Sequence, residues 1–269
     1  MIKLIVTDMD GTFLNSKSEY DKKNFSLLFK QLKEKNVHFV ACSGKQYECL
    51  QTIFSDDVKD EIWYVGDSAT RIIFKGKTLF QSYLSPKVAL KIIKYLVNYG
   101  DYFGTVVCTT KAAYIDSKTS PNIFKVFQRS FKGLEKLNSL YYLIDNILKI
   151  TIYDPTGESN LIYNKLQEKY SKQAYVVASE LEWLDISAKE AHKGSTIKKL
   201  QEILRISPEE TLVFGDGEND IELMKVAKHS YAMANACDNL KKVARHIAKS
   251  NNENGVLEVI QDYLNRGLI

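Results

Sequence analysis

The run Leu4-Ile5-Val6-Thr7-Asp8-Met9-Asp10-Gly11-Thr12 opens the sequence and decides its fold. Its first four residues form a short apolar stretch, which is the pattern of a buried strand. Two carboxylates, Asp8 and Asp10, follow directly, and Gly11 behind them permits a sharp backbone turn. Such a pair occurs in solvated turns and calcium loops. It also occurs where a protein holds a divalent cation and keeps one carboxylate oxygen free to attack.

An EF-hand calcium loop is excluded for this pair. That loop requires Gly at its sixth position, which counted from Asp8 is Phe13. A strand also precedes the pair, where an EF-hand has a helix. The ordinary solvated turn and the catalytic site both stay open at this stage.

Composition and charge place the chain among ordinary globular proteins. It has 269 residues, of which 45% are hydrophobic and 26% charged, enough for one large domain or two small ones. The net charge of +4 is spread thinly, without a Lys/Arg block of the kind that binds nucleic acid. No apolar stretch approaches the ~20 residues of a membrane span. We therefore expect neither a nucleic-acid nor a membrane partner.

The four cysteines are scattered and form no C-x-x-C pair, which argues against a zinc or thioredoxin-type site. Few, scattered cysteines in a chain of this length are typical of a reducing compartment. The sequence starts with a strand pattern and lacks the charged and apolar regions of a secretory signal. These features predict a cytoplasmic protein. They leave its oligomeric state open between a monomer and a homodimer.

Strand and helix patterns alternate in the first part of the chain. Apolar runs at residues 3–7, 37–41 and 62–65 are strand-like, and apolar residues recur at helical spacing within residues 21–36. This β-α-β rhythm predicts a parallel sheet with helices on its faces. A hairpin pattern follows at residues 71–81.

The rhythm then changes to a mixture of helix and strand patterns, and the first rhythm resumes near Lys193. We therefore predict a core domain made of residues 1–83 and 191–269. An α+β domain at residues 84–190 interrupts it.

Polar clusters follow three of the predicted core strands. Besides the first pair, these are Ser43-Gly44-Lys45 and Gly215-Asp216-Gly217-Glu218-Asn219-Asp220, while Lys193-Gly194 opens a helix. Open parallel sheets bind ligands at the carboxyl ends of their strands, so we expect the clusters to meet. Taken singly, each is an ordinary helix cap or surface charge. Together they supply a hydroxyl and an N–H for a phosphate, an ammonium, and the hard oxygen ligands that Mg²⁺ prefers.

In this order, the clusters D-x-D-G-T, S-G, K-G and G-D-x-x-N-D resemble those of the haloacid dehalogenase superfamily of aspartate-nucleophile phosphatases. Met233-Ala234-Asn235-Ala236 and Asn252-Glu253-Asn254-Gly255-Val256 further resemble the C-terminal signatures of its Cof-like group. The resemblance spans the whole chain. It implies an α/β fold, with a Rossmann-like parallel-sheet core domain and the insert as a C2-type α+β cap domain.

The resemblance also implies an activity, that of a phosphatase of small phosphorylated metabolites. Sugar phosphates come first and phosphorylated cofactors or their precursors next, with Mg²⁺ as the cofactor. Asp8 would be the nucleophile, and Asp10 the general acid and base. The residues that would bind the phosphoryl group are Ser43, Gly44, Lys193 and Asn219. The metal ligands would be Asp8, the backbone carbonyl of Asp10, Asp216 and Asp220.

Three positions depart from the usual pattern of that superfamily. Lys45 stands where Arg is usual, Asp67-Ser68-Ala69 replaces N-G-A, and His192 replaces a small polar residue before the motif lysine. Lysine keeps the charge of arginine but not its planar fork, so the contacts of the usual residue are not carried over to Lys45. His192 either contacts substrate or lies in solvent.

Two other functions stay open. A sugar phosphomutase would share the phosphoaspartyl intermediate and form an isomer in place of free phosphate. A non-catalytic regulator that binds phosphorylated metabolites would need no nucleophile. The presence of both Asp8 and Asp10 argues against the regulator.

Overall fold

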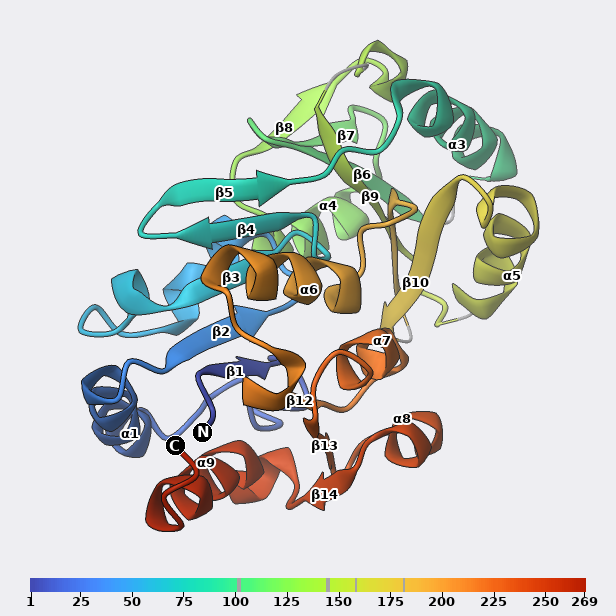
Figure 1. The fold of residues 1–269 in the computed structure, drawn as a ribbon. Helices are drawn as coiled ribbons and strands as arrows, with labels where there is room; N and C mark the ends of the chain where they lie inside the picture. Colours follow the sequence, from blue (N-terminus) through green and yellow to red (C-terminus); the bar gives the residue numbers. More distant parts are fainter. Residues whose placement is uncertain (101–102, 144–145, 158, 181) are drawn as a thin grey trace.

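The computed structural model describes residues 1–100, 103–143, 146–157, 159–180 and 182–269. Two sheets organise these residues (Figure 1). The larger sheet has the strand order β14-β13-β12-β1-β2-β3-β4-β5, and the smaller has the order β10-β11-β9-β6-β7-β8. The chain thus combines a mostly parallel core sheet with a second, mostly antiparallel one.

The core sheet takes its strands from both ends of the chain. Its strands are β1 (Leu4–Thr7), β2 (His38–Cys42), β3 (Trp63–Gly66), β4 (Arg71–Phe74), β5 (Lys77–Gln81), β12 (Thr211–Gly215), β13 (His229–Met233) and β14 (His246–Ala248). From β14 to β3 all neighbours are parallel, and β4 and β5 add an antiparallel hairpin at one edge. β1 is fully buried and lies between β12 and β2. The parallel sheet predicted from the β-α-β rhythm is therefore confirmed.

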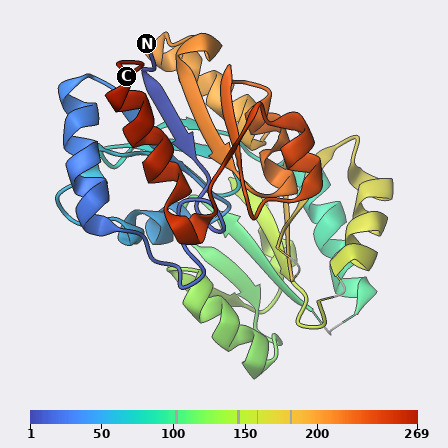
Figure 2. The ribbon, with the colours of Figure 1, turned by 90° about the horizontal axis from the view of Figure 1, so that it is seen from below.

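Helices cover both faces of the core sheet. In the described residues the α-helices are α1 (Lys22–Glu34), α2 (Tyr47–Leu50), α3 (Pro86–Tyr99), α4 (Pro121–Ser130), α5 (Ser159–Tyr170), α6 (Lys193–Leu204), α7 (Ile221–Met224), α8 (Asp238–Val243) and α9 (Gly255–Asn265). Figure 2 shows α1 and α9 side by side on one face, with α6 and α7 on the other. None of the helices in the described ranges is long and apolar enough to cross a membrane.

Local sequence explains where α1 begins and which of its faces is buried. The Asp21 carboxylate accepts a hydrogen bond from the Asn24 backbone N–H, which caps the helix. Phe25, Leu28 and Leu32 recur three and four residues apart, so they share one face, and all are buried against the sheet.

Short 3₁₀ turns complete the connections between elements. In the described residues they are η1 (Gln51–Ile53), η2 (Lys59–Glu61), η3 (Leu140–Tyr142), η4 (Pro208–Glu210), η5 (Glu218–Asp220) and η6 (Asn251–Glu253).

The second sheet is built from residues between 104 and 188. Its strands are β6 (Gly104–Thr109), β7 (Ala113–Asp116), β8 (Leu134–Leu137), β9 (Ile147–Tyr153), β10 (Ala174–Glu180) and β11 (Trp183–Ala188). Figure 1 places this sheet above the core sheet, with α3 and α5 beside it. It has its own apolar core, in which Ile92, Ile150 and Leu166 are buried. We call the part of the chain that carries this sheet the cap, whose predicted limits of 84–190 stay a prediction.

Candidate active site

The polar clusters that follow three core strands meet above the carboxyl edge of the sheet. Asp8, Ser43 and Asp216 are the first residues after β1, β2 and β12, which are neighbours in the sheet. A cavity of about 580 Å³ lies over this edge. From the core it is lined by Asp8, Asp10, Ser43, Gly44, Asp216 and Asn219, among others. From the cap it is lined by Arg129, Ser130, Phe131, Lys149, Thr151, Trp183 and Asp185.

Three carboxylates and one ammonium cluster at the floor of the cavity and directly below it, with Asp8 and Asp216 lining the cavity itself. One oxygen from each of Asp8, Asp216 and Asp220 lies within 4.8 Å of the others. Lys193 Nζ donates to Asp8 Oδ1 at 2.5 Å and to Asp220 Oδ1 at 2.6 Å. The second oxygen of Asp220 accepts the backbone N–H groups of Asp216 and Gly217 at 3.0 and 3.1 Å. Lys193 and Asp220 are buried, and the Lys193 ammonium joins Asp8 to Asp220.

Burial and mutual repulsion shift the pKa values of this group of acids. Burial raises the pKa of Asp8 well above the ordinary value; Lys193 opposes that rise, and the Asp220 and Asp216 carboxylates add to it. Burial likewise raises the pKa of Asp216 to about 6. For Lys193 burial acts downward, but Asp220 and Asp8 outweigh it and raise the pKa of its ammonium. Three clustered carboxylates face one cation, so the site has the charge and the hard oxygen donors that suit a divalent metal ion.

Gly11 is required where the loop after β1 passes Asp216. Its φ is +75°, and a Cβ at this position would lie 2.3 Å from Asp216 Oδ2. The hydroxyl of Thr12 donates to Asp216 Oδ1 at 2.6 Å. The D-x-D-G-T run therefore orients an acid 200 residues away along the chain, as well as carrying two of its own.

Asp10 is separated from the acid cluster and pairs with Lys45. The Lys45 ammonium donates a hydrogen bond to the Asp10 carboxylate, and both side chains are about one-third exposed at the cavity wall. Ser43 Oγ accepts the Lys45 backbone N–H at 3.1 Å, which shapes the loop after β2. Lys45 thus contacts the side chain predicted to be the general acid. Sequence reasoning missed this contact, because the reach of a lysine side chain has no sequence signal.

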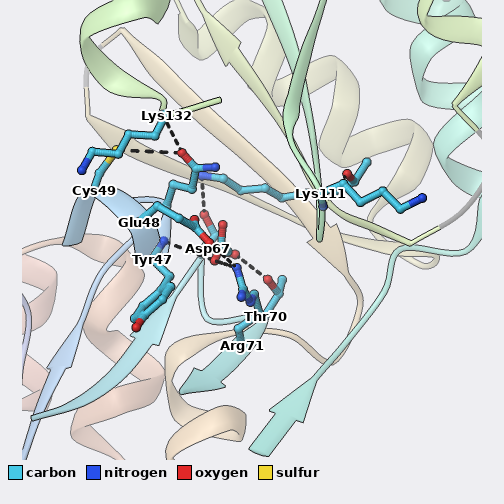
Figure 3. Close-up of polar contacts among 12 residues, drawn as sticks. Tyr47, Glu48, Cys49, Asp67, Thr70, Arg71, Lys111 and Lys132 are labelled. Atoms are coloured by element: carbon cyan, nitrogen blue, oxygen red, sulfur yellow. Dashed lines mark hydrogen bonds and ion pairs between the residues drawn. The ribbon is translucent and has the colours of Figure 1, made fainter. Parts of the chain in front are cut away.

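Asp67 holds the loop after β2 in place. The sequence marked this residue only as the first of Asp67-Ser68-Ala69, which replaces the usual N-G-A of the superfamily. The backbone N–H of this residue donates to the Lys45 carbonyl at 2.8 Å, and its carboxylate accepts from the Tyr47 N–H at 3.4 Å and from Arg71 at 3.3 Å. Figure 3 shows Asp67 between Tyr47 and Arg71. Burial raises the pKa of Asp67 to about 6, against the pull of Arg71.

His192 occupies neither of the two places expected for it. Its Nδ1 accepts the Ser195 backbone N–H, and Ser195 Oγ accepts the His192 N–H in return, so the pair forms a capping box at the start of α6. Its ring packs against Tyr175 of the cap with centroids 5.4 Å apart. Burial lowers the pKa of His192. The residue therefore positions the helix that presents Lys193.

The C-terminal signatures, together with Asn251 directly before the second of them, hold the loop after β1 from behind. Asn235 Nδ2 donates to the Gly11 carbonyl at 2.8 Å, and Asn251 Nδ2 donates to the Leu14 carbonyl at 2.8 Å. Asn235 Oδ1 in turn accepts the Asn251 backbone N–H at 3.1 Å. Asn252 Oδ1 accepts the Ser16 backbone N–H at 2.9 Å. These residues fix the loop that carries Asp8 and Asp10.

Comparisons with known proteins agree with the resemblance stated from the motifs. A family profile described as haloacid dehalogenase-like hydrolase matches residues 5–260. The 5-amino-6-(5-phospho-D-ribitylamino)uracil phosphatase YbjI of Escherichia coli (strain K12) is 30% identical over 263 residues, which cover 98% of this chain and 96% of the relative. A Bacillus subtilis (strain 168) protein of the same described activity, YwtE, is 25% identical, with 98% of each chain covered.

A solved structure has the same fold over nearly the whole chain. The crystal structure of SMU.1108c from Streptococcus mutans UA159 matches with a TM-score of 0.91 and 36% identity, covering 98% of this chain and 100% of the other. The family profile spans almost all of the sequence and includes every polar cluster around the cavity. The chain belongs to the haloacid dehalogenase-like hydrolases.

Proposed function

We propose that the protein is a Mg²⁺-dependent phosphatase that hydrolyses small phosphate monoesters through a phosphoaspartyl intermediate on Asp8. The observation that carries this proposal is the cluster on the cavity floor, where Asp8 is held by Lys193 within 4.8 Å of two further acids. A carboxylate fixed at the end of a buried strand and open to a cavity of about 580 Å³ is placed to attack a bound phosphorus atom.

The residues fit a divalent metal ion. Asp8, Asp216 and Asp220 supply hard oxygen donors, and together they carry two more negative charges than Lys193 offsets. The backbone carbonyl of Asp10 would complete the protein ligands. When bound, Mg²⁺ would offset the repulsion between the anionic nucleophile and the anionic phosphate.

The chemistry divides between the two acids of the first loop. An Asp8 oxygen attacks phosphorus, and the bond from phosphorus to the leaving oxygen breaks while Asp10 donates its proton to that oxygen. In the second step Asp10 takes a proton from water, whose oxygen attacks phosphorus. The Asp8–phosphorus bond then breaks, and inorganic phosphate is released. Ser43, the Gly44 N–H, Lys193 and Asn219 would hold the phosphoryl oxygens during both steps.

For the substrate we propose 5-amino-6-(5-phospho-D-ribitylamino)uracil as the first compound to test, ahead of sugar phosphates. Two relatives that cover nearly the whole chain carry this activity in their names. The compound joins a flat ring to a phosphorylated polyol. Phe131 and Trp183 offer aromatic surface on the cap side of the cavity, and aromatic faces pack well against flat rings.

Phosphate release from a panel of esters tests the proposal. The panel contains this compound, hexose monophosphates and pyridoxal phosphate, each measured with Mg²⁺ and with excess chelator. We expect release that requires Mg²⁺ and favours the uracil compound. Isomer formation from a hexose monophosphate without free phosphate would indicate a phosphomutase. No turnover of any ester with Mg²⁺ would contradict the proposed phosphatase.

A further inference from the structure

Two charged residues occupy buried positions of the cap sheet. Lys149 in β9 is 3% exposed, and Asp185 in the neighbouring strand β11 is 4% exposed. In the antiparallel register Asp185 pairs with Thr151 and Ser187 pairs with Lys149, so Lys149 and Asp185 are diagonal neighbours on one face of the sheet. Both side chains line the cavity above Asp8. The buried charges of the cap therefore face the core domain.

The Lys149 ammonium is satisfied only with the help of the core domain. Its three donors reach the Gly44 carbonyl at 2.9 Å, Ser68 Oγ at 3.1 Å and Asp185 Oδ1 at 3.1 Å. Two of these three acceptors belong to the core. Burial acts to lower the pKa of Lys149, but Asp185 and other nearby acidic groups together outweigh it and raise that pKa, so the side chain stays charged. A buried ammonium is stable only when each of its three N–H groups has an acceptor, so Lys149 depends on the two acceptors of the core domain.

Asp185 is tied to both domains in the same way. Its Oδ1 accepts from Thr151 Oγ1 at 2.6 Å within the cap, and its Oδ2 accepts from the Ser68 hydroxyl of the core. A Cβ added to Gly44 would lie 3.3 Å from Asp185 Oδ2. The absence of a side chain at Gly44 thus lets the cap carboxylate approach the loop after β2.

Ser68 is presented to the cap by an unusual turn. Asp67, Ser68 and Ala69 all have positive φ, at 55°, 57° and 62°. Left-handed backbone costs about 1–2 kcal/mol for each residue with a side chain, so the turn persists only because its surroundings hold it. Asp67 supplies that hold through its hydrogen bonds to Tyr47 and Arg71 (Figure 3).

The loop after β2 meets the cap at a second point. Gln46 Oε1 accepts the Lys132 backbone N–H at 2.8 Å, and Cys49 Sγ lies 3.6 Å from the Ser130 carbonyl oxygen. Figure 3 shows Cys49 and Lys132 at this boundary. Cys49 is half-buried there, so its thiol becomes more accessible when the cap moves away.

We propose that Lys149 is a positioning residue that, with the cap closed, holds the Gly44 carbonyl and so fixes the Gly44–Lys45 peptide. The N–H of that peptide donates to Ser43 Oγ, so the contact keeps Ser43 and Gly44 in the arrangement that binds the phosphoryl group. Asp185 and Ser68 hold the ammonium in place for this contact. The inference rests on the proposed function, because it takes Gly44 as a phosphoryl-binding residue. Closure of the cap then completes the phosphate site. Opening removes two acceptors of Lys149 and frees the Gly44 peptide as phosphate leaves.

Two readouts on the whole protein test this role. Iodoacetamide labelling followed by peptide mass spectrometry measures the alkylation rate of Cys49, with Cys237 on the core as an internal reference. Phosphate release from the best ester of the panel gives kcat/KM. The variants are Lys149→Met, which removes the ammonium, and Ser68→Ala, which removes one core partner. Lys136→Met is the matched control, because Lys136 is an exposed cap lysine over the Phe124 ring.

For Lys149→Met we expect Cys49 labelling to rise several-fold while Cys237 labelling is unchanged. We expect kcat/KM to fall by about tenfold to a hundredfold, the size of a misplaced binding group. Ser68→Ala should raise Cys49 labelling and lower kcat/KM by smaller factors. If Lys149→Met does not fold, the comparison of Ser68→Ala with wild type tests the inference. Lys136→Met should shift neither.

The contrary results are also defined. Unchanged Cys49 labelling in folded Lys149→Met would show that Lys149 does not hold the cap to the loop. Faster labelling with unchanged kcat/KM would show that it holds the cap without positioning Gly44. Either result overturns the inference while the phosphatase stands. A wild-type protein without turnover contradicts the proposed function, and the Cys49 rates still decide whether Lys149 holds the cap.

Discussion

Removal of the Lys193 ammonium is expected to destabilise the core domain strongly. Lys193→Met keeps the apolar stem but leaves Asp8 and Asp220 without the cation that contacts them at 2.5 and 2.6 Å. Loss of one partner of a buried ion pair costs about 3–5 kcal/mol. The other oxygen of Asp220 keeps two backbone N–H donors. We therefore expect a loss near the lower limit, about 3 kcal/mol of unfolding free energy.

Urea unfolding followed by circular dichroism measures this loss, at about pH 7.5 and without divalent ions. Lys199→Met is the control, since Lys199 lies on the same helix and forms a surface pair with Glu202, and such pairs contribute about 0–1 kcal/mol. The pKa of Asp8 is already raised in the folded protein, and in the variant it loses the opposing effect of Lys193. A carboxyl with a raised folded pKa binds protons more tightly when folded, so the deficit should shrink as pH falls. Mg²⁺ should shrink it too. A variant within ~1 kcal/mol of wild type at about pH 7.5 would refute this account of the site.

Asp8→Asn should abolish phosphate release while circular dichroism stays native, because the amide oxygen is a poor nucleophile; near-normal turnover would remove Asp8 from that role. Gly11→Ala places a Cβ 2.3 Å from Asp216 Oδ2 at a φ of +75°, so the Mg²⁺ concentration for half-maximal activity should rise, as a metal titration would show. Burial raises the folded pKa of Asp67 to about 6 from 3.8. The stability contributed by its protonated form is thus full below the unfolded pKa and is lost as pH rises through about 6. Asp67→Asn should therefore reduce the slope of unfolding free energy against pH between these two pKa values, by the contribution of one proton, as urea unfolding at several pH values would measure. An unchanged slope in that variant would show that Asp67 does not titrate there.

The core strands β1, β2 and β12 are predictable because each combines two independent signals, whereas β13 and β14 do not appear among the sequence predictions. β1 and β12 are short apolar runs, and each is followed at once by the polar cluster that the cavity needs. The clusters then indicate that these strands end at the same edge of one sheet, since open parallel sheets bind ligands at the carboxyl ends of their strands. Both signals lie within a few residues of each strand end, where sequence patterns are most informative.

The cap is harder to predict, because its order depends on contacts between distant segments. α4 and the strands β7 and β8 do not appear among the sequence predictions, and α4 buries only Ile123 and Phe127, too few to show a helical period. The register that joins Lys149 to Asp185 is also non-local. One signal was present in the sequence: Lys149 is a charged residue in the middle of the apolar run of β9. A charge at a buried strand position indicates an oppositely charged or hydrogen-bonding partner, whose position the sequence does not give.

The C-terminal signatures illustrate how a motif can be diagnostic without contacting substrate. Asn235 of the first signature and Asn251, directly before the second, do not line the cavity, as far as the described residues extend, and their amides instead satisfy carbonyls of the loop that carries the two acids. That loop has left the sheet, so its carbonyls have no ladder partners and need donors from elsewhere. The donors come from the other end of the chain, about 220 residues away from Gly11. The geometry of Asp8 and Asp10 therefore depends on the segments after β13 and at η6 being in place. A substitution such as Asn235→Ala acts on turnover through the loop, even though the residue lies outside the cavity wall.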